Sequence, residues 1–277
     1  MMLVNGLAQE TISLSDRALN YGDGVFETIR LQHGRPILFQ QHMQRLQLGS
    51  ERLGIACDFS LLQKELADLQ DQFTTAGVLK IIISRGQGGR GYRPAKQMQA
   101  TRIISLHPLP DYSAFDQQAG VQVFVCQHRL SEQTNLAGIK HLNRLDQVMA
   151  SREWPDERYF EGLMCDQQGS LVEGTRSNLF MARAGKLYTP GIINCGVAGI
   201  LRAWLLDKLA GEILELNCLD MPTLLQADEV FLCNSVMGVW PVKRLLLADS
   251  EQHYSPGDWT EKARALFDAL LESDAAP

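Results

Sequence analysis

The 277-residue sequence predicts an α+β fold divided into two domains, and three observations lead to this prediction. Patterns typical of helices and strands follow one another without the strict alternation of a doubly wound parallel sheet. The length suits one large domain or two of ordinary size. The segment 108–120, which contains Pro108 and Pro110, is the best candidate for a linker. We therefore expect an N-terminal α/β domain over residues 1–107 and a C-terminal α/β domain over residues 121–277.

In the first domain, the apolar pattern predicts a hairpin, two helices and a pair of buried strands. Alternating apolar residues or unbroken β-branched runs give the expected strands Val25–Leu31, Ile37–Phe39, Val78–Ser84 and Thr101–Leu106. A turn over His33–Pro36 joins the first two of these strands. Apolar residues three and four positions apart give the expected helices Gln40–Leu53 and Ser60–Thr75.

The second domain is expected to contain short strands, a central helix and a closing helix. The strands are expected at Val121–Val125, Gly162–Cys165, Leu171–Val172, Asn178–Met181, Glu212–Leu216 and Glu229–Leu232. The helices are expected at Ile200–Leu209 and Trp259–Leu271.

One lysine, Lys140, lies in a stretch whose apolar residues recur at helical spacing. These residues, which are expected to face a core from one helix, are Leu136, Ile139, Leu142, Leu145, Val148 and Met149. Burial beside them would favour the neutral amine of Lys140, which is the form that attacks an aldehyde to form a Schiff base. The alternative, and the commoner one for a lysine, is a stem that covers apolar surface while the ammonium stays in water.

Composition and charge restrict the partners and the compartment. A net charge of −6 at pH 7 argues against nucleic acid or an anionic membrane surface as the main partner. No apolar run approaches the length of a membrane span, and the first residues lack the basic and apolar regions of a signal peptide. The six cysteines form no CxxC pair, and the six histidines lack metal-ligand spacing. We therefore expect a cytoplasmic protein with reduced cysteines and no metal site.

The segment Gly86–Gly91 matches GxGxxG after a predicted strand, yet its surroundings exclude a dinucleotide-binding fold. That motif requires a helix to begin within the glycines. Here Pro94 follows closely, and the residue before a proline is disfavoured in helical geometry. Arg85 and Arg90 make the loop suitable for holding a carboxylate. The alternative is a solvated turn in which the two arginines have no binding role.

Two further features indicate recognition of charged groups. Gly199 precedes the expected helix at Ile200, and the unpaired amides of a helix N-terminus favour a phosphate, although glycines before helices are common. Glu173 ends a short strand among apolar neighbours, where a carboxylate needs a cationic or protonated partner. An internal ion pair is the alternative for Glu173.

Several short motifs also stand in a characteristic order along the chain. Between Asn5 and Val242 they are Ser15–Ala18, Tyr21–Arg30, His42–Leu46, Ile139–Asn143, Glu173 with Ser177–Phe180, Gly199–Arg202, Ala227–Val230, Cys233–Ser235 and Pro241–Val242. In this order the chain resembles the fold type IV family of pyridoxal-phosphate enzymes, which includes branched-chain and D-amino-acid aminotransferases and a lyase. The resemblance implies a two-domain α+β enzyme, a pyridoxal 5′-phosphate cofactor, a small-molecule substrate and a homodimer.

The resemblance also implies roles for individual residues. Lys140 matches the lysine that forms the Schiff base, and Glu173 matches the carboxylate that pairs with the pyridinium nitrogen of the cofactor. The groups that match the phosphate contacts of the family are Arg45, the backbone amides of Ile200 and Leu201, and the Ser235 hydroxyl. Arg90 matches an arginine that binds the substrate carboxylate in D-amino-acid aminotransferases.

Three positions distinguish among the members of the family. Phe26 replaces a carboxylate-binding tyrosine, Thr28 stands where aminotransferases have an apolar residue or glycine, and Asn234 replaces a glycine. Phe26 and Thr28, two positions apart, are expected on one face of a strand, toward the cofactor. Together with the strings Ser84–Tyr92 and Ile139–Val148, these positions resemble the aminodeoxychorismate lyases.

That resemblance implies conversion of 4-amino-4-deoxychorismate to 4-aminobenzoate and pyruvate, on the route to folate. Lys140 would transfer the proton, and Thr28 would deliver a proton or orient the substrate. The residues expected to bind the substrate are Phe26, Arg90 and Asn234. The main alternative is an aminotransferase for D-amino or branched-chain substrates, with the same lysine and cofactor. A non-catalytic relative that binds the cofactor only for structure is a further alternative. It is less consistent with the sequence, because Lys140 and Glu173 are both present.

Overall fold

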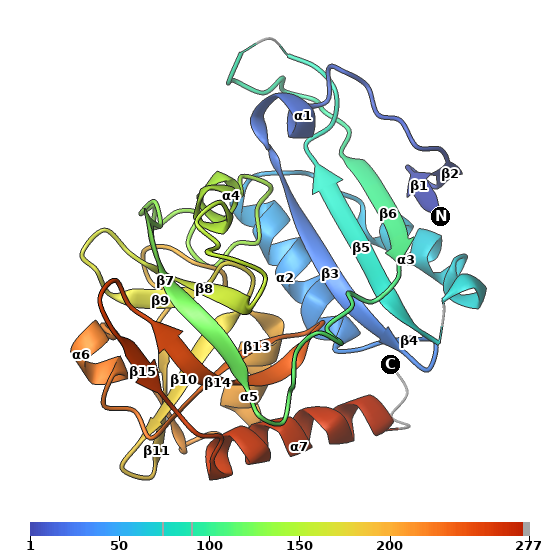
Figure 1. Cartoon of the computed structure of the whole chain (residues 1–277). Helices are drawn as coiled ribbons and strands as arrows, with labels where there is room; N and C mark the ends of the chain where they lie inside the picture. The colour runs from blue at the N-terminus through green and yellow to red at the C-terminus, as the bar shows by residue number, and fades with distance from the viewer. Residues whose placement is uncertain (74, 90, 274–277) are drawn as a thin grey trace. The chain divides into compact units, whose positions relative to one another are not determined.

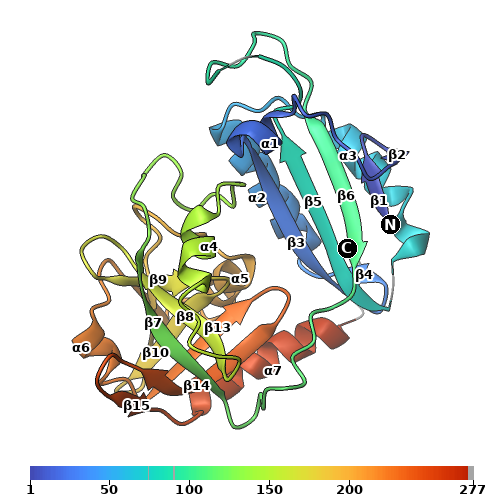
Figure 2. The same ribbon diagram turned by 45° about the horizontal axis from the view of Figure 1, so that its top comes forward.

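The computed structural model contains both helices and strands, which confirms the predicted α+β class (Figures 1 and 2). It describes residues 1–73, 75–89 and 91–273. Within these ranges, no helix is both long enough and apolar enough to cross a membrane. Residues 108–120, the expected linker, contain no helix or strand.

Contacts within the chain divide it into two compact units. The first unit contains residues 1–109 together with the short segment 139–143. Among the described residues, the second unit contains 110–138 and 144–273. By its contacts Lys140 therefore belongs to the first unit, whereas the sequence analysis assigned it to the C-terminal domain.

The first unit is built on a six-stranded antiparallel sheet with the strand order β2-β1-β6-β5-β3-β4. Its strands are β1 (Met2–Val4), β2 (Leu7–Ala8), β3 (Gly24–Gln32), β4 (Arg35–Pro36), β5 (Ala76–Ser84) and β6 (Thr101–His107). Its helices are α1 (Arg17–Tyr21), α2 (Phe39–Arg52), α3 (Phe59–Ala67) and a 3₁₀ helix over Gln70–Gln72. A core that includes Ile29 and Ile81 from the central strands packs against Leu46 of α2 and Leu62 of α3.

Two of the elements expected in this unit differ from those in the structure. The predicted strand Ile37–Phe39 is wrong, because Leu38 has a positive φ of 53° and α2 begins at the next residue. The predicted helix Ser60–Thr75 is too long, because the chain changes to the 3₁₀ helix after Ala67. Residue 74, which that prediction included, lies outside the described ranges.

The second unit is built on a nine-stranded sheet. Its strands are β7 (Val121–Arg129), β8 (Tyr159–Cys165), β9 (Leu171–Gly174), β10 (Asn178–Arg183), β11 (Lys186–Pro190), β12 (Ile213–Leu216), β13 (Glu229–Asn234), β14 (Gly238–Leu246) and β15 (Glu251–His253). Its helices are α4 (Leu145–Ser151), α5 (Ile200–Lys208), α6 (Met221–Leu224) and α7 (Asp258–Glu272). Because β9 pairs with both β8 and β10, the path β10-β13-β14-β7-β8-β9 closes into a ring.

The helix expected around Lys140 is much shorter than its apolar spacing predicted. Only the end of that stretch is helical, as α4, and its exposed apolar residues are Leu145, Val148 and Met149, at 73%, 53% and 42% of their surface. Gly138 has a positive φ of 80°, and the residues that follow it run beside β3 instead of forming a helix. Ile139 is buried, but in the core of the first unit. The expectation that these residues share one buried helical face is therefore wrong.

Candidate active site

A short extended segment holds Lys140 against β3. The Phe26 amide donates a hydrogen bond to the Lys140 carbonyl oxygen at 3.0 Å, within an antiparallel bridge that joins Val25 and His141. The Lys140 ammonium lies 4.4 Å from the centre of the Phe26 ring, which is within the range of a cation–π contact. Backbone pairing with a sheet therefore fixes the position of this lysine.

Phe26 and Thr28 lie on the face of β3 that points away from the helices. From Val25 onward, the residues of β3 alternate between buried and half-buried, and these two are half-buried. They share one strand face, as their spacing predicted. Lys80 of β5 pairs in register with Thr28, and its ammonium lies 5.7 Å from the centre of the Phe26 ring. Two lysine ammonium groups therefore lie near the Phe26 ring, one from β5 and one from the segment that carries Lys140.

On the opposite face of β3, Glu27 forms a buried charged cluster with α2. Its carboxylate accepts hydrogen bonds from His42 Nδ1 at 2.6 Å, Arg45 Nε at 2.7 Å and Arg45 Nη2 at 2.6 Å. Burial raises the pKa of the Glu27 carboxyl, but the Arg45 charge and these hydrogen bonds outweigh it and lower the pKa to about 2. Of these three residues, only Arg45 was predicted from the sequence to have a binding role. The sequence does contain a signal for Glu27, because a carboxylate at an inward-facing position of an alternating strand needs a buried partner.

We expect this cluster to make the stability of the fold sensitive to acid. A carboxyl whose pKa falls from 4.5 to about 2 on folding stabilises the folded state fully above pH 4.5. This contribution, up to about 3 kcal/mol, is lost as the pH falls through that interval. Urea unfolding should therefore show a steeper loss of stability on acidification in the wild type than in Glu27→Gln. Parallel pH profiles of the two proteins would contradict the expectation.

In the second unit, Glu173 is held in one orientation at the end of β9. The residue is only 4% exposed, and its Oε2 accepts a hydrogen bond from the Val197 amide at 2.8 Å. Nε2 of Gln147, from α4, lies 3.5 Å from Oε1. Burial lowers the pKa of the Arg144 guanidinium, and the charge of Glu173 opposes that shift. A buried carboxylate held in this way suits a protonated ring nitrogen as its partner.

The N-terminus of α5 has the features of a phosphate site. Gly199 is the N-cap residue, and because it lacks a side chain it makes no side-chain cap hydrogen bond. Ile200 and Leu201 are buried, and their amides have no acceptor in the described part of the chain. Buried, unpaired amides at a helix N-terminus favour an anion, because the helix dipole adds to their partial charges. These donors therefore fit the phosphate of the cofactor that the sequence implied.

The loop before α5 depends on a glycine at position 199. A Cβ atom there would lie 1.8 Å from Oδ1 of Asn178, so any other residue would displace the Asn178 side chain. Nδ2 of Asn178 donates to the Val197 carbonyl oxygen at 3.0 Å. Because the Val197 amide also binds Glu173, one loop positions both the carboxylate and the helix N-terminus.

Asn234 and Ser235 follow each other at the end of β13. Oδ1 of Asn234 accepts from the amides of Val236 and Met237 at 2.9 and 2.8 Å, and its Nδ2 donates to the Arg176 carbonyl oxygen at 2.9 Å. These bonds fix the turn into β14 and with it the position of Ser235, which is 9% exposed. The contacts of Asn234 within the chain are therefore structural, and its contact with a substrate stays a prediction.

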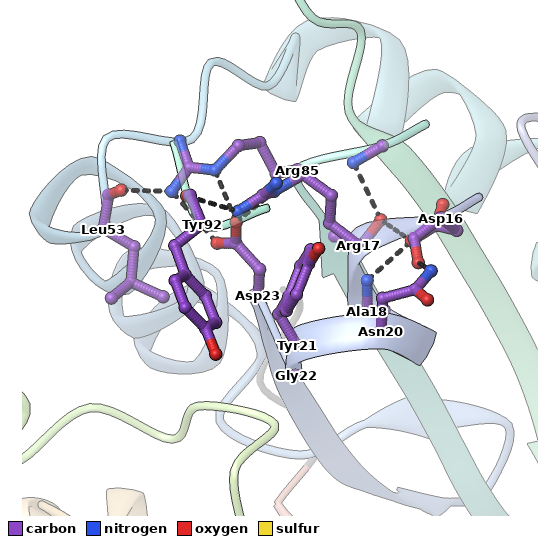
Figure 3. A network of polar contacts seen from close by, with 12 residues as sticks. Asp16, Arg17, Ala18, Asn20, Tyr21, Gly22, Asp23, Leu53, Arg85 and Tyr92 are labelled. Atoms are coloured by element: carbon purple, nitrogen blue, oxygen red, sulfur yellow. Dashed lines mark hydrogen bonds and ion pairs between the residues drawn. The ribbon is translucent and has the colours of Figure 1, made fainter. Parts of the chain in front are cut away.

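The glycine loop after β5 is anchored by α1, as Figure 3 shows around Arg17 and Asp23. Arg17 donates to the Asp23 carboxylate at 2.8 Å and to the carbonyl oxygens of Gly91 and Tyr92 at 3.0 and 2.9 Å. The Tyr21 hydroxyl accepts a hydrogen bond from the Gly91 amide at 3.0 Å. The loop is therefore tied down just after position 90.

Arg85, which the sequence analysis considered for binding a carboxylate, holds a carboxylate of the chain itself. It donates to both oxygens of Asp23, at 2.8 and 3.0 Å, and to the carbonyl oxygen of Leu53 (Figure 3). It also donates to the carbonyl oxygen of Gly54. Burial raises the pKa of Asp23, but hydrogen bonds from Arg85 and then Arg17 outweigh it, so the pKa is lowered. Arg90, the other candidate of this loop, lies outside the described residues.

Comparisons with known proteins add to these observations. Residues 24–245 match the model of the family described as amino-transferase class IV. The chain is 36% identical to an aminodeoxychorismate lyase of Vibrio harveyi over 271 residues, which cover 95% of this chain and 97% of that protein. It is 41% identical to the crystal structure of 4-amino-4-deoxychorismate lyase from Pseudomonas aeruginosa, with a TM-score of 0.88 and coverage of 96% and 97%. Branched-chain amino acid aminotransferase of Escherichia coli gives 25% identity, a TM-score of 0.84 and coverage of 98% and 94%.

Proposed function

Because the chain belongs to the amino-transferase class IV family, we propose that it is a pyridoxal-phosphate-dependent lyase. Its reaction is the conversion of 4-amino-4-deoxychorismate to 4-aminobenzoate and pyruvate, in folate biosynthesis. The observation that carries this proposal is similarity over nearly the whole chain to two proteins named as lyases of this substrate, at 36% and 41% identity. The identity to the branched-chain aminotransferase, 25%, is lower than the identity to either lyase. An aminotransferase is therefore the second candidate function.

Groups of the kinds that bind pyridoxal 5′-phosphate are present among the described residues, and they support the proposed cofactor. The residues that we propose to bind it are Lys140, Glu173, Arg45, Ile200, Leu201 and Ser235. The buried amides without acceptors at the start of α5 support the phosphate contacts. When bound, the cofactor supplies a ring that accepts the electron pair of a bond broken at the substrate carbon.

Each of the proposed catalytic groups has a distinct task. With the cofactor bound, the Lys140 amine would act as a base and remove the proton from the amine-bearing carbon of the substrate. The negative charge of Glu173 keeps a proton on the ring nitrogen. Thr28 orients the substrate or delivers a proton from the face of β3 that it shares with Phe26. The further residues proposed to bind the substrate are Arg90 and Asn234.

Incubation of the purified protein with 4-amino-4-deoxychorismate and the cofactor tests the proposal. We expect 4-aminobenzoate and pyruvate to form in equal amounts. A parallel reaction should contain a D-amino or branched-chain amino acid with 2-oxoglutarate, and its turnover should be far slower. Transamination as the main activity would instead identify the second candidate.

We also propose that the chain forms a homodimer. The exposed apolar residues of α4 support this proposal, because apolar side chains grouped on one short helix are typical of an interface. Sedimentation at micromolar concentration should therefore give about twice the 30.9 kDa mass of the chain. A fully active monomer at that concentration would disprove the dimer. The cytoplasmic location also stays a proposal, supported by six cysteines that are all free thiols.

A further inference from the structure

We propose that Glu27 is a positioning residue for the cofactor phosphate, which it serves by orienting Arg45 with the help of His42. The inference rests on the proposed function, in which Arg45 binds that phosphate. Glu27 is on the side of β3 that faces α2, so it acts through Arg45 and takes no part in the chemistry itself.

The geometry of the guanidinium group carries the inference. Glu27 holds Nε and Nη2 of Arg45 at 2.7 and 2.6 Å. A bidentate pair of this kind fixes the plane of a guanidinium as well as its position. The Arg45 side chain is 15% exposed, and an arginine stem has several rotamers among which the pair selects. The pair therefore sets the orientation of Arg45 before an anion binds.

His42 holds the same carboxylate from the same helix. Residues 42 and 45 are three positions apart on α2, so both side chains reach toward β3. His42 is fully buried, and burial lowers its pKa, so a neutral ring donates from Nδ1 to Glu27 at 2.6 Å. Its Nε2 has no hydrogen-bond partner within the described ranges. The one polar contact of this ring is therefore the one that restrains Glu27.

A purely structural role explains the cluster less well. Buried ion pairs are often no more stabilising than apolar residues of similar volume, because the cost of desolvation offsets their attraction. The apolar core around β3 and α2 includes Val25, Ile29 and Leu46, so the charged cluster is buried beside apolar side chains. The positive charge of Lys140 contributes to the lowered pKa of His42, so the cluster lies within electrostatic reach of the proposed cofactor lysine. A role in orienting Arg45 beside Lys140 explains why charged residues are buried at this position.

The test compares pyridoxal 5′-phosphate with pyridoxal, which lacks the phosphate. Dissociation constants for both are measured by absorbance titration of cofactor-free wild type, Glu27→Gln, Arg45→Gln and the double variant. We expect Glu27→Gln to weaken pyridoxal 5′-phosphate binding by about 10-fold and pyridoxal binding by less than about 2-fold. In the Arg45→Gln background, Glu27→Gln should leave the ratio of the two constants unchanged, because both residues act through one contact.

Glu65 of α3 provides a matched control. It forms a buried bidentate pair with Arg102 in the same unit, at 2.9 and 2.7 Å. We expect Glu65→Gln to lower the melting temperature without changing the ratio of the two dissociation constants. A change in this ratio equal to that of Glu27→Gln would mean that any damage to the unit produces the effect, and the inference would be wrong.

The remaining outcomes separate this inference from the proposed function. If Arg45→Gln discriminates between the two ligands and Glu27→Gln does not, Glu27 has no positioning role, whereas the proposed cofactor site stands. If Arg45→Gln does not discriminate, the assignment of Arg45 is wrong and the inference fails with it. Should Glu27→Gln not fold, Glu27→Asp replaces it, because the shorter carboxylate cannot hold the guanidinium in the same place. The same selective loss is then expected.

Discussion

Replacing Lys140 with alanine is expected to remove the visible absorption band of the bound cofactor and to lower kcat by at least about 10³-fold. Alanine has no amine to bind the cofactor aldehyde and none to remove the proton from the substrate. Absorption spectra before and after borohydride reduction, together with assays of 4-aminobenzoate formation, measure the two effects. Full activity of Lys140→Ala would remove the central assignment.

Lys80 offers a matched control for this experiment. Its ammonium lies on the same sheet face and 5.7 Å from the same Phe26 ring, whereas that of Lys140 lies at 4.4 Å. Lys80→Ala should therefore change the local charge to a similar extent and keep the reducible band. Loss of the band in Lys80→Ala and its retention in Lys140→Ala would exchange the roles of the two lysines.

Replacing Glu173 with glutamine is expected to preserve the fold and cofactor binding while lowering kcat on the order of 10²-fold. The amide oxygen still accepts a hydrogen bond from Val197, but its neutral group no longer keeps the ring nitrogen protonated. Single-turnover measurements should place the loss in proton removal from the substrate. An unchanged kcat would mean that Glu173 is only part of a buried ion pair.

Glu229 is the control for loss of a buried carboxylate in the second unit. It is 6% exposed and accepts hydrogen bonds from the amides of Gly257, Trp259 and Thr260 at the start of α7. Glu229→Gln should therefore weaken a helix cap and lower the melting temperature, with kcat unchanged. A fall in kcat equal to that of Glu173→Gln would show that the rate responds to any such change.

The sequence predicted correctly those elements whose apolar residues fit only one type of secondary structure. The strands Val78–Ser84 and Thr101–Leu106 lie within β5 and β6 and are neighbours, as expected, because unbroken β-branched runs suit a buried sheet. The stretch around Lys140 misled for a physical reason. Spacing by three and four shows that residues share a face if the chain is helical, but the pairing of His141 with Val25 makes the chain extended there.

The site shows a similar limit. The roles proposed for Lys140 and Glu173 came from the family resemblance, since no local pattern distinguishes them from other charged residues that have apolar neighbours. The partnership of Glu27 and His42 required the packing of β3 against α2, which joins positions 15 residues apart. An arginine-rich loop predicts a bound carboxylate, but the pattern cannot tell whether the carboxylate belongs to a substrate or, as for Arg85, to the chain.

The assignment of residues 139–143 to the first unit makes that unit discontinuous in sequence. A fragment ending at residue 109 would lack the segment that pairs with β3, and the amide of Phe26 would lose its acceptor. It would also lack the proposed cofactor lysine. If this fragment were expressed alone, its sheet would lack the segment 139–143 that pairs with β3. The same loss would occur if the fragment were exchanged for the corresponding part of another enzyme. Chimeras need a second junction, after residue 143, to transplant this sheet intact.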